Sequence, residues 1–366
     1  MDFDRPVFFD VMAYADAAEG DVVDMVSGNP DWEPPEALRE GLREYADGPP
    51  ADFQYPPSEG LGDLREEIAT RRGVDVDRVV VTNGGGEANY LAMACGLDAF
   101  SGTETLLTDP TYPYYPDRAA MLGSEVRYVP VGPTGDLDPA DVRERASEDT
   151  ALVVVNSPNN PTGAVYDADT VAELVGIAEE HDALLVSDEV YDHFDYSGRF
   201  ASALAVESEN RVVTGSFSKS MAITGLRVGY AILPEALVGP ARARHMLVNV
   251  AGSHPGQRAV LSALRDTGPE YYEANRDLLR ERVRVFTDAL DRAGAEYVVP
   301  DGAFYVLARF EGMEGTLDNA KRLVDETGVA GMPGDAFGET TSGWFRYALV
   351  TDRVEEAAER LAESMG

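Results

Sequence analysis

Short apolar runs alternate along the first two thirds of the chain with longer segments in which apolar residues recur every three or four positions. The runs are bounded by turn residues and predict β-strands at 22–27, 78–81, 103–108, 124–129, 151–155, 183–187, 211–214 and 226–232. The segments with helical periodicity predict helices at 35–46, 64–72, 87–99, 114–122, 139–147, 169–181 and 234–247. Because strands and helices alternate, we expect an α/β fold with a mostly parallel sheet flanked by helices on both faces.

The last third of the chain has a different pattern. Helices are predicted at 256–293, the longest part at about 270–293, and at 316–327 and 353–363. Strands are predicted between them at 296–299, 303–309, 328–331 and 344–349. This order indicates a smaller α+β unit. We therefore expect a large domain at residues 45–255 and a small domain formed by residues 1–44 and 256–366, with the helix at 270–293 bridging them.

The composition indicates a folded protein without a membrane partner. The 366 residues suffice for two domains, and 44% of them are hydrophobic. No apolar run is long enough to span a bilayer, and the acidic start of the chain lacks the pattern of a signal peptide. Cys95 is the only cysteine, which excludes an internal disulfide and is interpreted as a small buried residue. These features favour a reducing, cytoplasmic location.

The net charge of −36, from 66 acidic and 30 basic residues, is extreme. It excludes general nucleic-acid binding, which needs a basic surface. The acids are spread through the predicted helices, so their mutual repulsion destabilises the compact state at low salt. Screening shortens the range of that repulsion from about 10 Å at 0.1 M salt to about 3 Å at 1 M. The composition therefore resembles that of halophilic proteins from a high-salt cytoplasm, with an ordinary acidic protein as the alternative.

Lysine is rare in this chain, and one lysine stands in an unusual setting. Only Lys219 and Lys321 occur among the 30 basic residues. A lysine amine can lose its proton and attack a carbonyl, whereas a guanidinium stays protonated. Lys219 follows an apolar run and is flanked by Ser and Gly, while Lys321 lies on the charged face of a predicted helix. We interpret Lys219 as a Schiff-base lysine rather than an ordinary surface charge.

Other polar groups follow the predicted strands, where ligands bind in open α/β sheets. They lie in the segments Thr82–Glu87, Asn156–Gly163, Ser187–Tyr191 and Ser216–Arg227. The glycines before the predicted helix at 87–99 would let backbone N–H groups approach a bound anion. The alternative is that these glycines only form a turn. Asp188 at a buried strand end is costly unless it meets a cation such as a protonated pyridine nitrogen; a helix cap is the alternative. Arg227 is a natural partner of phosphate. Together with Lys219, these groups match a pyridoxal phosphate site.

On these segments the chain resembles the fold-type I pyridoxal-phosphate enzymes of the class I/II aminotransferase family, from about Gly28 to Arg346. The resemblance implies that Lys219 forms the internal aldimine and later moves a proton at the substrate Cα. It implies that Asp188 pairs with the pyridine nitrogen, and that Tyr191 and Asn160 hydrogen-bond the phenolic oxygen. The remaining cofactor-binding residues that it implies are Tyr112, stacked on the ring, and Gly85, Gly86, Ser216, Ser218 and Arg227, around the phosphate.

The resemblance also implies how substrate and partner are bound. Arg346 would hold the substrate carboxylate, with Gly28 and Asn160 beside it. Tyr55 would reach the phosphate of a neighbouring subunit, which implies a homodimer. A cis bond is implied between Asn160 and Pro161. The chain departs from the family pattern at Glu87, the residue after Gly86. Some relatives have Ser, Thr or Lys at this position, so a side-chain hydrogen bond to the phosphate is lost here.

The expected function is transfer of an amino group between an L-amino acid and a 2-oxo acid. A β-lyase or an amino-acid decarboxylase of the same fold is the alternative, because these enzymes share the cofactor residues. A non-enzymatic effector-binding domain is a weaker alternative, because the N-terminus has no basic helix-turn-helix. No metal is expected.

The donor is predicted to be neutral, apolar or aromatic rather than aspartate, because no side-chain cation could be assigned to the pocket. Arg244 is the first candidate if that premise fails, and Asn249 and His254 lie in the same segment, which resembles one that reaches the pocket in relatives. The aromatic residues that could line the pocket, rather than pack in the core, are Phe8, Phe9, Tyr14, Trp32, Tyr114 and Tyr115.

Overall fold

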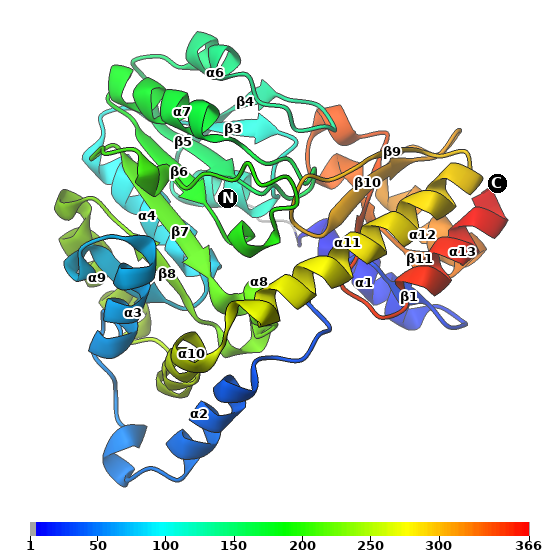
Figure 1. The fold of residues 1–366 in the computed structure, drawn as a ribbon. Helices are drawn as coiled ribbons and strands as arrows, with labels where there is room; N and C mark the ends of the chain where they lie inside the picture. Colours follow the sequence, from blue (N-terminus) through cyan, green and yellow to red (C-terminus); the bar gives the residue numbers. More distant parts are fainter. Residues whose placement is uncertain (1–4, 366) are drawn as a thin grey trace.

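A seven-stranded sheet forms the centre of the larger part of the molecule (Figure 1). The computed structural model describes residues 5–365, so the first four residues of the chain, including most of its acidic start, lie outside the described part. The strands are β2 (Val79–Thr82), β3 (Glu104–Asp109), β4 (Glu125–Pro130), β5 (Thr150–Asn156), β6 (Leu184–Asp188), β7 (Arg211–Ser216) and β8 (Gly229–Ile232). Their order is β2-β8-β7-β6-β5-β3-β4, and only β8 runs antiparallel to its neighbours. The predicted mostly parallel sheet is confirmed.

Helices cover both faces of this sheet because successive side chains of a strand point to opposite faces. In β5, Leu152 and Val154 pack with α4 (Gly85–Ala99), α5 (Tyr114–Met121) and α9 (Glu235–Asn249). Val153 and Val155 pack into the core on the other face. That core includes side chains from α2 (Glu36–Ala46), α3 (Gly62–Arg72), α6 (Pro139–Arg145), α7 (Ala168–Glu180) and α10 (His254–Asp266).

The smaller part is built on two further sheets. β12 (Met332–Pro333), β13 (Phe345–Ala348), β10 (Tyr305–Arg309) and β9 (Glu296–Val298) form an antiparallel sheet in that order. β1 (Val23–Asp24) pairs in parallel with β11 (Val329–Ala330). A separate core joins them to α1 (Val7–Ala17), α11 (Pro269–Arg292), α12 (Leu317–Thr327) and α13 (Val354–Met365). The predicted α+β character of this part is confirmed, and Figure 1 shows α11 running from near α10 to the small sheet.

Several elements differ from the predictions. The helix predicted over 256–293 is interrupted after α10, because Gly268 and Pro269 cap and start α11 as a new helix. Neither α1 nor the one-turn helix α8 (Phe217–Ser220) was predicted. The strand predicted from residue 226 begins at Gly229, since Thr224–Leu226 form a 3₁₀ turn. A single turn or a two-residue strand is too short to leave a periodic pattern in the sequence.

The division into two domains stays a prediction. α1 and β1 pack with the small sheet, in line with assigning the N-terminal segment to the small domain. α2 and α10 instead pack against each other and place Leu38, Ala259 and Leu264 in the core of the large sheet. A boundary set by core packing would therefore give both helices to the large domain. None of the helices within residues 5–365 is long and apolar enough to cross a bilayer.

Candidate active site

A cavity of about 890 Å³ lies between the carboxyl ends of the large-sheet strands and the small sheet. Residues from both parts line it, as expected where an open α/β sheet binds a ligand. The sequence-predicted site residues on its wall are Gly28, Gly85, Gly86, Tyr112, Asn160, Asp188, Tyr191, Ser216, Ser218, Lys219, Arg227 and Arg346. Tyr55 is not among them; its side chain is 82% exposed in the loop before α3.

Lys219 projects into the cavity from α8, the helical turn that follows β7. Ser216 caps this turn by accepting a hydrogen bond from the Ser218 N–H, which fixes the start of α8. The Lys219 Nζ donates to the Gly28 carbonyl oxygen at 2.7 Å. Burial, with the nearby charges of Arg346 and Arg227, lowers the pKa of Lys219 to about 8. The amine can therefore be neutral close to physiological pH, as a nucleophile or a base requires.

Asp188 ends β6 and is buried within a complete set of hydrogen bonds. It accepts from Asn89 Nδ2 at 2.6 Å and from the Tyr115 hydroxyl at 2.5 Å. Thr214 in turn donates to Asn89 Oδ1 at 2.7 Å and orients that amide. Burial raises the pKa of Asp188, and these donors oppose the rise. No Lys or Arg of the described chain forms an ion pair with Asp188, although the more distant charge of Arg118 also opposes the rise in its pKa. A bound cationic group could therefore pair with Asp188 directly.

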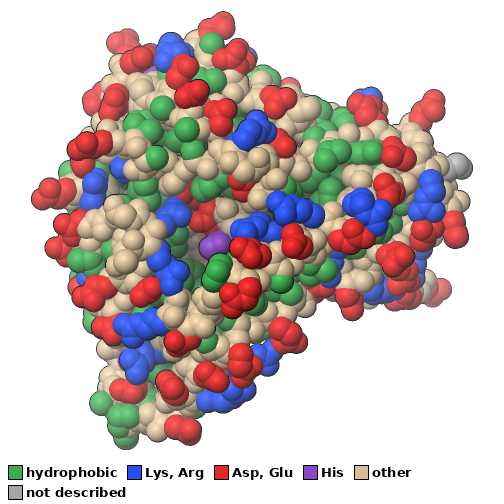
Figure 2. Space-filling model, in the orientation of Figure 1, with side chains coloured by type: hydrophobic (Ala, Val, Ile, Leu, Met, Phe, Trp, Pro, Cys, Tyr) green, Lys and Arg blue, Asp and Glu red, His purple; other side chains and the backbone are tan. Residues whose placement is uncertain are grey.

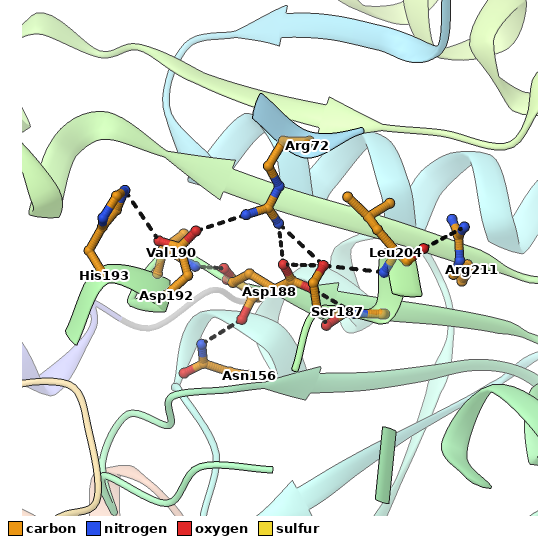
Figure 3. Close-up of polar contacts among 12 residues, drawn as sticks. Arg72, Asn156, Ser187, Asp188, Val190, Asp192, His193, Leu204 and Arg211 are labelled. Carbon is orange, nitrogen blue, oxygen red and sulfur yellow. Dashed lines mark hydrogen bonds and ion pairs between the residues drawn. The ribbon is translucent and has the colours of Figure 1, made fainter. Parts of the chain in front are cut away.

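A second acidic cluster fixes the segment behind Asp188 (Figure 3). The Glu189 carboxylate accepts hydrogen bonds from Arg72, Ser202 and the Ala203 N–H. Arg72, the last residue of α3, also donates to Asp192 at 2.8 Å. The Arg72 and Glu189 side chains are 14% and 1% exposed, so this is a largely desolvated ion pair. It joins α3 to the segment that presents Asp188 and Tyr191 to the cavity.

The start of α4 forms a cradle suited to an anion. Its first N–H groups have no partner within the helix, and the helix dipole favours negative charge there. Gly84 has φ 78°, and a Cβ at this position would lie 2.5 Å from Arg227 Nη2. A Cβ on Gly85 would lie 3.0 Å from the Val190 side chain. Glycine is therefore required for the backbone to approach Arg227 and a bound anion closely.

The Glu87 side chain, where the family pattern departs, points away from this cradle. Its carboxylate accepts from the Asn83 N–H at 2.6 Å and contacts His245 Nδ1 at 2.7 Å. Asn249 Nδ2 donates to the same carboxylate. Glu87 thus ties the glycine loop to α9 instead of contacting the cradle.

Arg346 lies on the small-sheet wall, in β13. It is buried and stacks on Tyr305 at 4.5 Å and on Phe337 at 5.3 Å between its guanidinium carbon and the ring centroids. Its Nη1 lies 3.5 Å from Asn160 Oδ1, and its Nε is buried without a hydrogen-bond partner. The peptide bond between Asn160 and Pro161 is cis, as implied by the resemblance.

The structure adds residues that the sequence did not reveal. The Tyr305 hydroxyl lies 2.8 Å from that of Tyr191, and Asn89 and Tyr115 hold Asp188. Their positions depend on packing between distant segments rather than on a local pattern. The cavity is also lined by Arg118 from α5 and by Arg5. The described residues contain no cluster of His, Cys, Asp or Glu able to hold a metal ion.

The premise that no side-chain cation reaches the pocket is therefore wrong. Arg244 pairs with Asp98, outside the cavity, whereas Arg118 faces the cavity from a helix that directly follows β3. Asn249 and His254 do not line the cavity either. Of the aromatic candidates, Phe8, Tyr114 and Tyr115 line it; Phe9, Tyr14 and Trp32 do not. The preference for a neutral donor thus loses one of its two premises, the absence of a cation, and stays a prediction that rests on the aromatic lining alone.

Comparison with known proteins identifies the family. The chain matches the family model "Aminotransferase class I and II" over residues 20–363. It is 33% identical over 359 residues to a probable aspartate/prephenate aminotransferase of Thermus aquaticus, covering 94% of this chain and 92% of that protein. The structure of the Thermus thermophilus aspartate aminotransferase with maleate is similar, with a TM-score of 0.90, 32% identity and coverage of 99% and 97%.

An Escherichia coli protein with a methionine aminotransferase function is also similar, with a TM-score of 0.90, 28% identity and coverage of 99% of this chain and 97% of that one. The Escherichia coli protein and the Thermus thermophilus enzyme both share their fold with this protein over nearly the whole chain. The chain therefore belongs to the class I and II aminotransferases, with their fold-type I architecture.

Proposed function

We propose that this aminotransferase holds pyridoxal 5′-phosphate in the cavity between its two sheets. The family implies this cofactor, and the residues present fit it. The glycine cradle with Ser216, Ser218 and Arg227 suits a phosphate, and the buried Asp188 carboxylate suits a protonated ring nitrogen. The observation on which the proposal rests most is the Lys219 amine, whose pKa is lowered to about 8 inside this set of groups.

When bound, the cofactor supplies a carbonyl for covalent attachment and an electron sink for charge that develops at the substrate Cα. The protein groups would do the rest. Asp188 would hold the ring protonated, Tyr191 and Asn160 would donate to its phenolic oxygen, and Tyr112 would pack on its face. Lys219 Nζ, whose pKa is lowered to about 8, would accept the proton from the substrate Cα and would donate a proton to the cofactor's carbonyl carbon, on the other side of the transferred nitrogen.

Arg346 would bind the α-carboxylate of the donor. Its Nε is buried without a partner, and a carboxylate would satisfy that donor in the bidentate geometry that arginine prefers. Gly28 borders the same space: a Cβ there would lie 2.8 Å from the Tyr305 hydroxyl. The named activities of the relatives include aspartate, prephenate and methionine transamination, so the family alone does not determine the side chain of the donor.

Replacement of Lys219 tests this function, and the second lysine provides the control. Lys219→Ala is expected to fold, to lose at least about 10⁴-fold in kcat with any donor, and to show no covalent cofactor by mass spectrometry after borohydride reduction. Lys321→Ala removes the other lysine of the chain, which lies on α12. This variant should keep its activity and the increase in mass that the covalently attached cofactor gives. Near-normal turnover in Lys219→Ala would contradict the proposal, as would cofactor attached at Lys321.

We further propose a homodimer in a high-salt cytoplasm. Tyr55 is 82% exposed, and the end of α9 exposes Leu247 and Val248 by 81% and 69%, which is unusual for large apolar side chains in water. A two-fold partner would cover such residues and place Tyr55 at the neighbouring cradle. Sedimentation at working salt measures the assembly, and a persistent monomer would count against the shared site.

A further inference from the structure

Arg118 is a cation on the cavity wall that the described part of the protein leaves without an anionic partner. No carboxylate of that part lies within ion-pair distance of its guanidinium, and Nη1 is buried without a hydrogen-bond partner. Its guanidinium carbon lies 5.8 Å from the centroid of the Tyr114 ring. A buried guanidinium N–H without an acceptor raises the free energy of the folded state, so a ligand with an oxygen acceptor at this point would be favoured.

The position of Arg118 makes a second anion site separate from that of Arg346. Arg118 lies on α5, which packs with the large sheet, whereas Arg346 lies on β13 of the small sheet. Both line the same cavity. A Cβ on Gly86 would lie 3.4 Å from Arg118 Nη2, an ordinary van der Waals distance, so the guanidinium lies beside the first turn of α4. The cavity thus has a cation on each of two walls, which fits a small molecule with two carboxylates.

We propose that Arg118 binds the side-chain carboxylate of an acidic amino donor and determines the preference of the enzyme for such donors. This inference rests on the proposed function, in which Arg346 binds the α-carboxylate. Arginine offers paired N–H donors that match a carboxylate, and enclosure of the pair strengthens it relative to water. Asparagine has the same shape as aspartate but no charge, so it would leave the guanidinium without its partner.

The cofactor phosphate is a less suitable partner for Arg118. The cradle already has Arg227, Ser216, Ser218 and the start of α4. The charges that lower the pKa of Lys219 are those of Arg346 and Arg227, whereas the charge of Arg118 acts on Tyr112, Tyr115 and Asp188.

Neither carboxylate on the cavity wall forms an ion pair with Arg118, although the arginine charge opposes the rise in pKa that burial causes in both. The two carboxylates that line the cavity are Asp188 and Asp117. Asp188 is already occupied by Asn89 and Tyr115, and Asp117 is exposed and not paired with Arg118.

The test compares aspartate and asparagine as donors in the wild-type holoenzyme, in Arg118→Met and in Arg5→Gln. Methionine keeps the length and packing of the side chain but has no charge. Loss of one partner from an enclosed charge pair predicts a fall in kcat/KM for aspartate of at least about 30-fold in Arg118→Met, with asparagine changed by less than about threefold. Arg5→Gln is the matched control, because Arg5 lines the same cavity but is exposed and pairs with Asp10.

Two binding measurements separate the possible roles of Arg118. The affinity for succinate, a dicarboxylate that cannot react, should fall in parallel with kcat/KM for aspartate, while the affinity of the cofactor-free protein for pyridoxal phosphate should stay the same. Equal losses for both donors together with weaker cofactor binding would assign Arg118 to the phosphate and overturn the proposal. A wild-type enzyme that transfers from asparagine or alanine at least as well as from aspartate would also overturn it, but would leave the aminotransferase function intact.

Discussion

At the scale of single residues, the most informative group is the Lys219 amine. Its Nζ is held 2.7 Å from the Gly28 carbonyl oxygen, which orients it without neutralising its charge. Of the arginines that line the same cavity, Arg346 and Arg227 disfavour an additional positive charge on Lys219. Burial acts in the same direction. The protein thus prepares a neutral amine at a point where few acidic groups could stabilise the ammonium form.

The titration of Lys219 in the cofactor-free protein tests this account. Because its pKa is lowered from an ordinary value of about 10.4 to about 8, the neutral fraction should increase through pH 7 to 9 and be nearly complete by pH 10. Competitive acetylation measured by mass spectrometry would follow this, since only the neutral amine reacts. Lys321, the other lysine, reports the reactivity of a solvent-accessible amine in the same sample. Half-maximal labelling of Lys219 at or above pH 10 would contradict the predicted shift.

Most of the residues predicted from the sequence stand at the end of a predicted strand or in the loop that follows it; Tyr55 and Arg346, which the family resemblance implied, do not. Lys219 lies just after β7, and Asp188 is the last residue of β6. Both positions are at the sheet edge where an open α/β sheet binds its ligands. Asn89 and Arg118 lie within helices, on faces that packing turns toward the cavity, and Tyr305 begins a strand of the small sheet. Which face of a helix meets a cavity depends on the tertiary arrangement, so these residues could not be predicted from the pattern alone.

At the scale of elements, the contact between α3 and the segment after β6 has the clearest structural consequence. Arg72 ends α3 and pairs with Glu189 and Asp192, which alternate with the cavity-facing residues of this segment. Figure 3 shows Arg72 pointing toward Asp192. Burial alone would lower the pKa of Arg72, but Tyr230 and the two acids outweigh this and raise it. Burial raises the pKa of Glu189, and Arg72 opposes that rise. The pair fixes a long-range contact between parts of the chain more than a hundred residues apart.

Removing only one partner of this ion pair should be worse than removing both. Arg72→Met leaves the Glu189 carboxylate buried without its main cation, which is expected to lower the free energy of unfolding by about 3–5 kcal/mol. The double variant with Glu189→Gln removes the most buried of the unpaired charges, leaving only the partly exposed Asp192 without Arg72, and should recover at least about 1 kcal/mol of that loss. Urea unfolding of the cofactor-free variants measures both quantities. If the two changes simply add, the pair is not the coupled contact described.

The element pattern itself was predicted well where a run was long and bounded by turn residues. All seven strands of the large sheet overlap a predicted run. Most of them are largely apolar because they are buried on both faces, whereas the edge strand β4 is mostly exposed. The bridging helix predicted at about 270–293 agrees with α11, whereas the end of α10 at Asp266 and the Gly268–Pro269 break were not specified within the helical range 256–293. The packing of α2 against α10 was also not foreseen, because no local pattern shows which sheet an amphipathic helix will cover.

At the scale of the whole molecule, charge is the dominant feature. Most arginines pair with acidic neighbours, largely at exposed positions such as Arg284 with Glu281 and Asp288. Such surface pairs contribute at most about 1 kcal/mol each. With 66 acids and 30 basic residues, many carboxylates remain without a cation, and Figure 2 shows acidic side chains scattered over the visible face rather than gathered in one patch. Repulsion is therefore distributed over the surface and acts on the fold as a whole.

Salt should consequently stabilise this protein. Raising KCl from about 0.1 M to 2 M shortens the screening length from about 10 Å to below 3 Å, which weakens repulsion among scattered carboxylates more than it weakens ion pairs in direct contact. The midpoint of thermal unfolding is expected to increase by at least several degrees, and most steeply below about 0.5 M, where the screening length changes fastest. Sucrose is the control, because it is excluded from protein surfaces but does not screen charge. Two results would show that the −36 charge does not limit the stability of the fold. One is a midpoint that stays constant or falls as KCl is added. The other is an equal increase in sucrose and in KCl, without the steep increase expected below about 0.5 M KCl.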